Sequence, residues 1–136
     1  MVRLRSGSRK GFSLVELVVV VLILGIIAAV AAPKMFSTAT DARTNSTRQS
    51  LTVVRDAIEL YNSQNSAYPT AATLATDLRP FLKGPFPSVQ MGTNRNANVI
   101  VTTQPVITSI EAGGAGWIYN QSTGDISVNE VPYISW

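Results

Sequence analysis

One carboxylate, Glu16, lies near the start of the most apolar stretch of this 136-residue chain, and sixteen uncharged residues follow it. Insertion scales put an acid at the centre of a membrane helix at a cost of about 2.5–3.5 kcal/mol, with a smaller cost near the helix end. A half-solvated position at the membrane interface explains such a residue, and so does a positive partner inside the membrane. If the chain is cut after Gly11, the new α-amine of Phe12 is such a cation. The amine of one copy can then meet Glu16 of a neighbouring copy.

The composition leaves few residues for catalysis or metal binding. The chain has no cysteine and no histidine, which excludes disulfides, thiolate metal sites and the commonest general base. Asp77, Asp125 and Glu130 are acids from which a calcium site in the C-terminal part would be built. Their spacing fits no ligand pattern, so solvated surface is the better interpretation. We therefore predict that the protein is not an enzyme and has no catalytic residue, metal or cofactor.

The net charge of +3 comes from the first eleven residues, which contain Arg3, Arg5, Arg9 and Lys10 and no acid. The other 125 residues carry seven basic and eight acidic side chains. A nucleic-acid interaction inferred from the high pI would therefore depend on this short segment alone. We predict no nucleic-acid partner, and we expect the basic end to stay on the cytoplasmic side of a membrane.

The run from Phe12 to Ala32 is apolar except for Ser13 and Glu16. As a helix, these residues would span about 32 Å, close to the bilayer core of about 30 Å. The composition leaves three interpretations open, namely a signal peptide released after Ala31, a plain signal anchor, or a retained helix behind a leader cut after Gly11. The cost of Glu16 favours the third, because a signal peptide or a simple anchor gains nothing from it.

The residue order across this segment is long and specific. The apolar run is preceded by the segment RKGFSLVEL, which contains a basic pair, a glycine, a phenylalanine, a serine and a glutamate in that order. The run ends in Ala-Ala-Pro33. This order resembles the N-terminal segment of type IV pilins and type II secretion pseudopilins. The resemblance implies cleavage between Gly11 and Phe12 by a membrane aspartyl prepilin peptidase, N-methylation of Phe12, and Glu16 as the carboxylate of filament assembly. It covers residues 9–36 closely and the rest in outline.

The resemblance also implies a function and a location. The chain would be a structural subunit that assembles into a helical filament of the type IV pilus or type II secretion pseudopilus kind. Its implied partners are other copies, the prepilin peptidase, an assembly platform protein and an ATPase. It would cross the bacterial inner membrane once, with a cytoplasmic N-terminus and an extracytoplasmic head, before entering the filament. An exported soluble binding domain, released by ordinary signal peptidase after Ala31, is the alternative from a different class.

Pro33 is expected to end or kink the apolar helix, because it lacks an N–H and crowds the preceding turn. Beyond it the sequence becomes amphipathic, and an apolar stripe recurs at helical spacing at Leu51, Val54, Ile58 and Tyr61. We interpret this stripe as core that covers one face of a C-terminal sheet. The sequence predicts a helix from Phe12 to about Ser63, ended by a polar run and Pro69.

The C-terminal part has short β-like runs separated by turn signals. We expect strands at residues 98–103, 106–110, 117–120, 126–129 and 133–136, a short helix at 73–82, and a hairpin turn at 122–125. The Gly113–Gly116 run lacks the Lys-Ser/Thr of a phosphate loop and indicates a strand connection. The predicted fold is α+β and pilin-like, with a long N-terminal helix packed on a small antiparallel sheet. Its segments are a leader (1–11), a transmembrane or filament-core helix (12–33), an amphipathic continuation (34–64) and a head (65–136).

Overall fold

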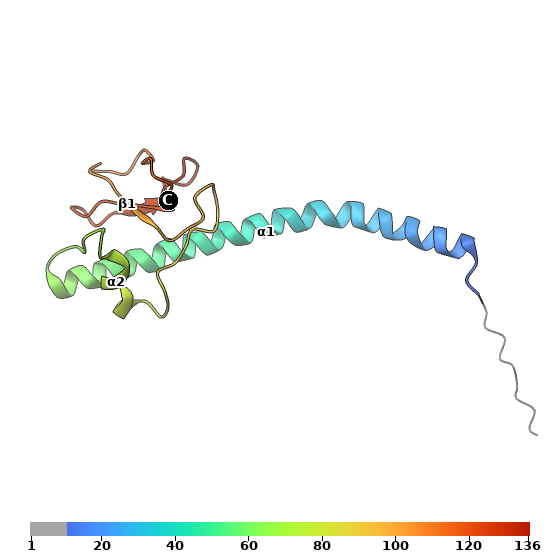
Figure 1. Cartoon of the computed structure of the whole chain (residues 1–136), viewed down its shortest axis with the longest axis horizontal. Helices are drawn as coiled ribbons and strands as arrows, with labels where there is room; N and C mark the ends of the chain where they lie inside the picture. The colour runs from blue at the N-terminus through green and yellow to red at the C-terminus, as the bar shows by residue number, and fades with distance from the viewer. Residues whose placement is uncertain (1–10) are drawn as a thin grey trace, which may run out of the picture. The chain divides into compact units, whose positions relative to one another are not determined.

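The computed structural model describes residues 11–136, so most of the predicted leader lies outside the described residues. The chain divides into two compact units, of which the first ends at Thr38 and the second spans Ala39–Trp136. We call residues 11–38 the stem and Ala39–Trp136 the head. One helix, α1 (Leu14–Asn65), contributes residues to both units, and the bounds predicted for it differ from the observed ones by two residues at each end (Figure 1).

The helix continues through Pro33 and does not end there. Just beyond it, the Ser37 and Thr38 hydroxyls both donate to the Lys34 carbonyl, each at 2.9 Å. Thr44 and Thr52 bond in the same way to carbonyls four residues earlier. Such bonds satisfy short polar side chains within a helix.

The C-terminal half of α1 packs one face against the rest of the head. Leu51, Val54 and Ile58 are fully buried, and Tyr61 is half-buried against the same core. The spacing of these residues places them on one side of the helix. The predicted core stripe is therefore confirmed.

Three short strands form the sheet: β1 (Val99–Val101), β2 (Trp117–Tyr119) and β3 (Ile126–Val128), in the order β1-β2-β3. β2 and β3 are antiparallel, as expected for a hairpin. β1 and β2 are parallel, so the sheet is mixed and the prediction of an antiparallel sheet is wrong for this pair. The chain between β1 and β2 is fifteen residues long, which is enough for the crossover that a parallel pair requires.

Two predicted strands are absent from the described residues. Residues 106–110 form a loop that the Gln104 side chain organises, since its Oε1 accepts hydrogen bonds from the backbone of Thr108 and Ser109. Residues 133–136 lie in successive turns, in which the Tyr133 N–H donates to the Glu130 carbonyl and the Trp136 N–H to the Tyr133 carbonyl. Local hydrogen bonds therefore replace ladder pairing in both segments. The predicted helix at 73–82 is present as two short pieces, α2 (Leu74–Asp77) and the 3₁₀ turn η1 (Arg79–Phe81), which contains Pro80.

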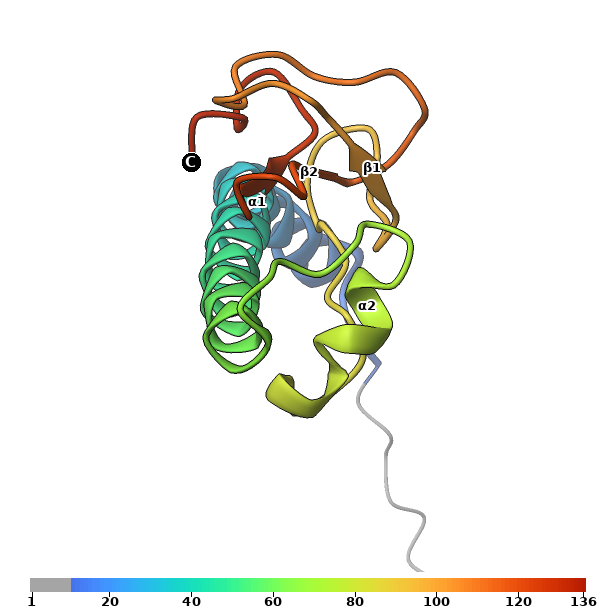
Figure 2. The same ribbon diagram turned by 90° about the vertical axis from the view of Figure 1, so that its left-hand side faces the viewer.

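The centre of the head core is aromatic. Trp117 and Tyr119 are both fully buried on β2. The Trp117 indole N–H donates to the Pro87 carbonyl at 2.9 Å, and the Tyr119 hydroxyl donates to the Pro69 carbonyl at 2.9 Å. Burial raises the pKa of the Tyr119 hydroxyl, so it stays a donor. These two bonds tie the loops before β1 to the sheet, and Figure 2 shows those loops beside α2.

Candidate functional site

The residues predicted to carry function gather at the N-terminus of the stem. Gly11 and Phe12 precede α1 outside any helix or strand, and Phe12 is 88% exposed. A Cβ built on Gly11 would meet no atom within 4 Å. The Gly11–Phe12 peptide bond is therefore non-helical and exposed on the described chain.

Glu16 has a partner within its own chain. Its Oε2 accepts a hydrogen bond from the Ser13 backbone N–H at 2.8 Å, and the Ser13 hydroxyl accepts one from the Val15 N–H at 3.2 Å. This arrangement is a capping box, in which two side chains satisfy backbone donors at the helix start. A carboxylate in the first turn also interacts favourably with the helix dipole. Glu16 therefore stabilises the start of α1 in a single copy.

The sequence carried the signal for this cap, because Ser13-Leu14-Val15-Glu16 has the S-x-x-E spacing of a capping box. Sequence reasoning considered only the membrane cost of the acid and a partner on another copy. Among the described residues, no donor contacts the second oxygen, Oε1. One oxygen is thus occupied by the cap, and the other has no donor within residues 11–136.

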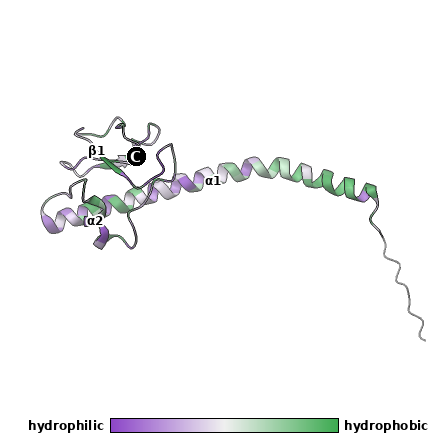
Figure 3. Ribbon diagram, in the orientation of Figure 1, coloured by the Kyte–Doolittle hydropathy of each residue, from purple (hydrophilic) through white to green (hydrophobic). Residues whose placement is uncertain are grey.

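The stem around these residues has an uncovered apolar surface. Every residue from 11 to 38 is exposed, and the Leu, Ile and Val side chains between Leu14 and Val30 are 46–78% exposed. Figure 3 shows this part of α1 as hydrophobic along its length. In the described chain, α1 is the one helix long and apolar enough to cross a membrane. Apolar area of this extent requires lipid or other protein to cover it.

The acids considered for calcium are engaged separately in the head. Asp77 accepts from the Thr73 hydroxyl at 2.6 Å, Asp125 from the Thr123 hydroxyl at 2.8 Å, and Glu130 from the Thr93 N–H at 3.2 Å. Within residues 11–136, no three acidic side chains come together as a candidate ligand group. Asp77 and Asp125 each stabilise their own turn, and Glu130 connects its turn to the loop around Thr93.

A different acid, Glu111, organises the loop between β1 and β2, and sequence reasoning missed it. Its Oε1 accepts from the Thr102 hydroxyl at 2.8 Å and from the Gln104 amide at 3.1 Å. The buried Asn129 side chain pairs with the Glu111 backbone in both directions, at 2.8 Å each. The hydrogen bonds from Thr102 and Gln104 lower the pKa of Glu111. No local spacing links these four residues, so only the fold shows the network.

Comparison with known proteins points to the same end of the chain. Residues 7–32 match the family described as the prokaryotic N-terminal methylation motif. The type II secretion system core protein G of Pseudomonas aeruginosa is 36% identical over 67 residues, which cover 49% of this chain and 47% of the relative. The protein of the same name from Klebsiella michiganensis is 31% identical over 67 residues, with the same coverage. The chain thus spans about half the length of these curated relatives.

No solved structure matches the chain. Over residues 7–32 the chain thus carries the prokaryotic N-terminal methylation motif. Over about half of its length it is similar to type II secretion system core protein G.

Proposed function

We propose that this chain is a structural subunit of a type II secretion pseudopilus or a related type IV pilus-like filament. The uncovered apolar surface of the stem carries the proposal, because it is long enough to cross a membrane and has nothing on it in a single copy. In the membrane, lipid covers this surface. In a filament, the stems of neighbouring copies cover it. The relatives' printed name, core protein G of a type II secretion system, supports the secretion filament.

Processing prepares the stem for assembly. A prepilin peptidase cuts the exposed bond between Gly11 and Phe12, and the new terminus of Phe12 is methylated. Before the cut, the Phe12 nitrogen is a peptide amide without charge. After it, the nitrogen is a cation four residues from Glu16. We assign no catalytic step to this chain, and we propose the inner membrane as its location before assembly.

The capping geometry makes Glu16 suitable for pairing between copies. Oε2 stays on the Ser13 N–H, which fixes the carboxylate at the start of α1. Oε1 then accepts the Phe12 amine of a neighbouring copy. Attraction between these charges is strong in a low-dielectric surrounding, and an unpaired charge there is costly. The ion pair therefore stabilises one axial offset between neighbouring stems over the others. An assembly platform protein and an ATPase would extract the subunits from the membrane.

The mass of the mature chain is the first test. A mature chain that begins at methylated Phe12 and retains the stem agrees with the proposal. A chain that begins near Ala32 instead supports the alternative, a binding domain released by ordinary signal peptidase. In that case the stem would be lost and no filament would form through it.

Two substitutions at Glu16 separate the cap from the ion pair. Glutamine at this position of a capping box still accepts from the backbone, whereas alanine does not. Because the pair requires charge, we expect both Glu16→Gln and Glu16→Ala to lower filament yield at least about tenfold, while both are still cut at Phe12. Sheared filaments and intact mass measure the two effects. Normal filament yield from Glu16→Gln would show that capping suffices and would contradict the pairing.

A further inference from the structure

The boundary between the stem and the head, after Thr38, falls within a polar part of α1. Residues 37–45 have the sequence STATDARTN. Six of these nine residues are serine, threonine, asparagine or aspartate, which have a weaker helix propensity than alanine or leucine. The fully apolar side chains of the segment are those of Ala39 and Ala42. We call residues 37–45 the polar linker.

Within residues 11–136, tertiary packing gives the polar linker little support. All of its residues are exposed except Thr44, which is half-buried. Two alanine side chains offer little apolar area, so lipid or a second copy would also gain little by covering this segment. The polar linker therefore differs from the preceding part of the stem, whose large apolar side chains require lipid or other protein to cover them.

Among the described residues, ion pairs do not support the polar linker either. Its charged residues, Asp41 and Arg43, are two positions apart, and side chains at this spacing do not face each other on a helix. Neither residue has an opposite charge three or four positions away in the sequence. The pairs that stabilise exposed helices are therefore missing from this stretch of the described chain.

The hydroxyl groups of the polar linker bond to its own backbone. Ser37 and Thr38 both donate to the Lys34 carbonyl. Thr44 donates to the Thr40 carbonyl at 3.0 Å. Bonds of this kind to a preceding carbonyl slightly destabilise a helix and often bend it. These side chains therefore do not compensate for the weak helix propensity.

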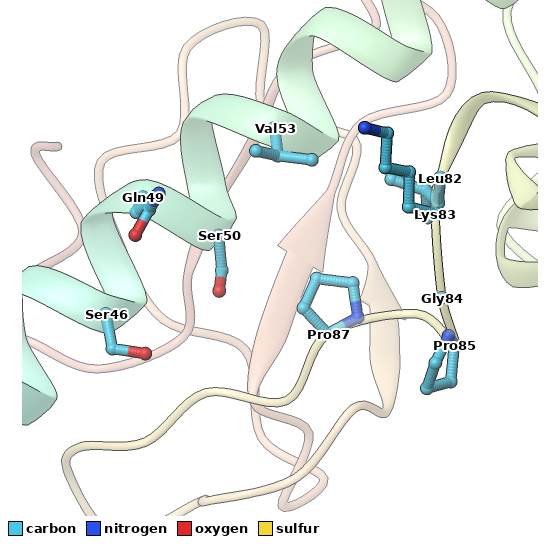
Figure 4. Close-up of a pocket in the computed structure, with 9 residues that line it drawn as sticks. All are labelled: Ser46, Gln49, Ser50, Val53, Leu82, Lys83, Gly84, Pro85 and Pro87. Atoms are coloured by element: carbon cyan, nitrogen blue, oxygen red, sulfur yellow. The ribbon is translucent and has the colours of Figure 1, made fainter.

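Better supported parts of α1 lie on both sides of the polar linker. On the N-terminal side is the apolar helix that is long enough to cross a membrane. On the C-terminal side, Thr47 is fully buried, and its hydroxyl accepts from the Gln90 N–H at 3.1 Å. Figure 4 shows that α1 from Ser46 onward forms one wall of a groove of about 240 Å³, whose other wall is the loop between Leu82 and Pro87. Contacts with the rest of the head thus begin where the polar linker ends.

We propose that the polar linker acts as a hinge, a helical segment that opens locally while the apolar helix and the head core stay folded. Local opening costs the least free energy where few contacts are lost, and within the described chain the polar linker has little packing and no ion pair to lose. Nine residues span about 14 Å as a helix and about 30 Å when fully extended. Opening therefore adds chain length between the stem and the head without exposing large apolar side chains. The use of this length in a filament rests on the proposed function, whereas the local opening does not.

Hydrogen exchange of the full chain in detergent micelles tests the opening, because this measurement requires no filament. Mass spectrometry of peptides compares the polar linker with the packed part of the same helix. After correction for intrinsic rates, we expect amides at residues 38–45 to exchange at least about 100-fold faster than amides at residues 51–61. Similar protection of the two segments would overturn the proposal.

A substitution in the head core shows whether the opening is local. Trp117→Ala destabilises the head, so amides at residues 51–61 should exchange at least about 100-fold faster than in the unsubstituted chain. Exchange at residues 38–45 should change by less than about twofold, because a local opening does not require the head to unfold. Equal acceleration of both segments would show that the polar linker opens only when the head unfolds, which excludes a hinge.

A matched pair of threonine substitutions gives a second measurement that does not destabilise the head. Thr44→Ala should slow exchange at residues 38–45 by about threefold, because alanine is the better helix former. Thr52→Ala is the control, since the Thr52 hydroxyl also bonds to a carbonyl four residues earlier but lies in the packed half of α1. It should leave exchange at residues 38–45 unchanged. Slower exchange of the polar linker in Thr52→Ala would contradict a local opening.

Proline substitutions test the hinge in the filament. Ala42→Pro breaks the helix within the polar linker, whereas Thr52→Pro breaks it beside the buried Leu51. We expect Ala42→Pro to keep the urea midpoint of the head and to retain filament yield within about twofold, while Thr52→Pro unfolds the head. Loss of filaments from Ala42→Pro with an intact head and normal processing would overturn the hinge. If the unsubstituted chain forms no filament, the proposed function fails, and the exchange measurements still decide the local opening.

Discussion

The stem and the head of this chain treat apolar side chains in opposite ways. In the stem, no described residue is buried, and valine, leucine and isoleucine side chains remain exposed along the helix. In the head, a shorter set of apolar residues is fully buried around Trp117 and Tyr119. The same helix, α1, takes part in both. The comparison shows that the head completes its core within one copy, while the stem depends on a surrounding that the single chain does not provide.

The polar side chains of the two units also differ in how far away in the sequence their hydrogen-bond partners lie. Polar side chains of the head bond across long sequence distances, as Asn129 does to the backbone of Glu111. In the stem, Ser13 and Glu16 bond to their own helix start. Among residues 11–136, nothing contacts the second oxygen of the Glu16 carboxylate. A change in the stem should thus affect assembly, and a change in the head core should affect folding.

The largest effect should come from blocking the cut. Gly11→Val is expected to leave the precursor unprocessed, with no mature chain and no filament. Because a side chain at Gly11 meets no atom of the described chain within 4 Å, the substitution cannot act through the fold. Intact mass and the thermal unfolding of the head measure the two effects. A Gly11→Val chain that is still cut to begin at Phe12 would contradict the requirement for glycine before the cut.

A substitution in the head core should destabilise the fold and leave processing of the N-terminus intact. Trp117→Ala removes the largest buried side chain and leaves the Pro87 carbonyl without its donor. We expect the free energy of unfolding to fall by about 3–5 kcal/mol. Membrane insertion and cleavage should be unchanged, since they depend on the stem. Loss of cleavage in this variant would contradict the expectation that processing depends on the stem and not on the head core.

The β2–β3 turn tests one backbone position of the head. Gly124 has φ +79°, and a Cβ there would overlap the Tyr68 ring. We expect Gly124→Ala to lower the free energy of unfolding by about 2 kcal/mol. Gly84→Ala is the matched control, because Gly84 has open space around it, and its effect should stay within about 0.5 kcal/mol. Equal urea midpoints for the two variants would contradict the strained-turn explanation.

The smallest effect should appear as a pH dependence at Glu111. Hydrogen bonds from Thr102 and Gln104 lower its pKa in the folded head. A carboxyl with a lowered folded pKa stabilises the fold above its unfolded pKa, and this contribution is lost as the pH falls through the folded pKa. Urea midpoints measured from neutral pH to about pH 3 should therefore fall less steeply for Glu111→Gln. Identical slopes would show that the network is insensitive to this charge.

Much of the stem could be predicted because its structure is local. The order of residues from Arg9 to Glu16, the apolar run and the long helix all follow from neighbours in sequence. The membrane cost of Glu16 predicts a partner on another copy, whereas its S-x-x-E spacing to Ser13 predicts the cap that the structure shows. Cleavage at Gly11, methylation of Phe12, pairing by Glu16 and a kink at Pro33 remain predictions.

The head was predictable where periodicity or turn chemistry is local, as in the stripe from Leu51 to Tyr61 and the hairpin at Gly124. The sequence alone therefore determined an apolar stem with one acid at its start and an α+β head without cysteine or histidine. The tertiary structure decided the parallel pairing of β1 with β2 and the Glu111 network. These features join residues far apart in the chain, and no local spacing encodes which distant groups meet once the core has formed.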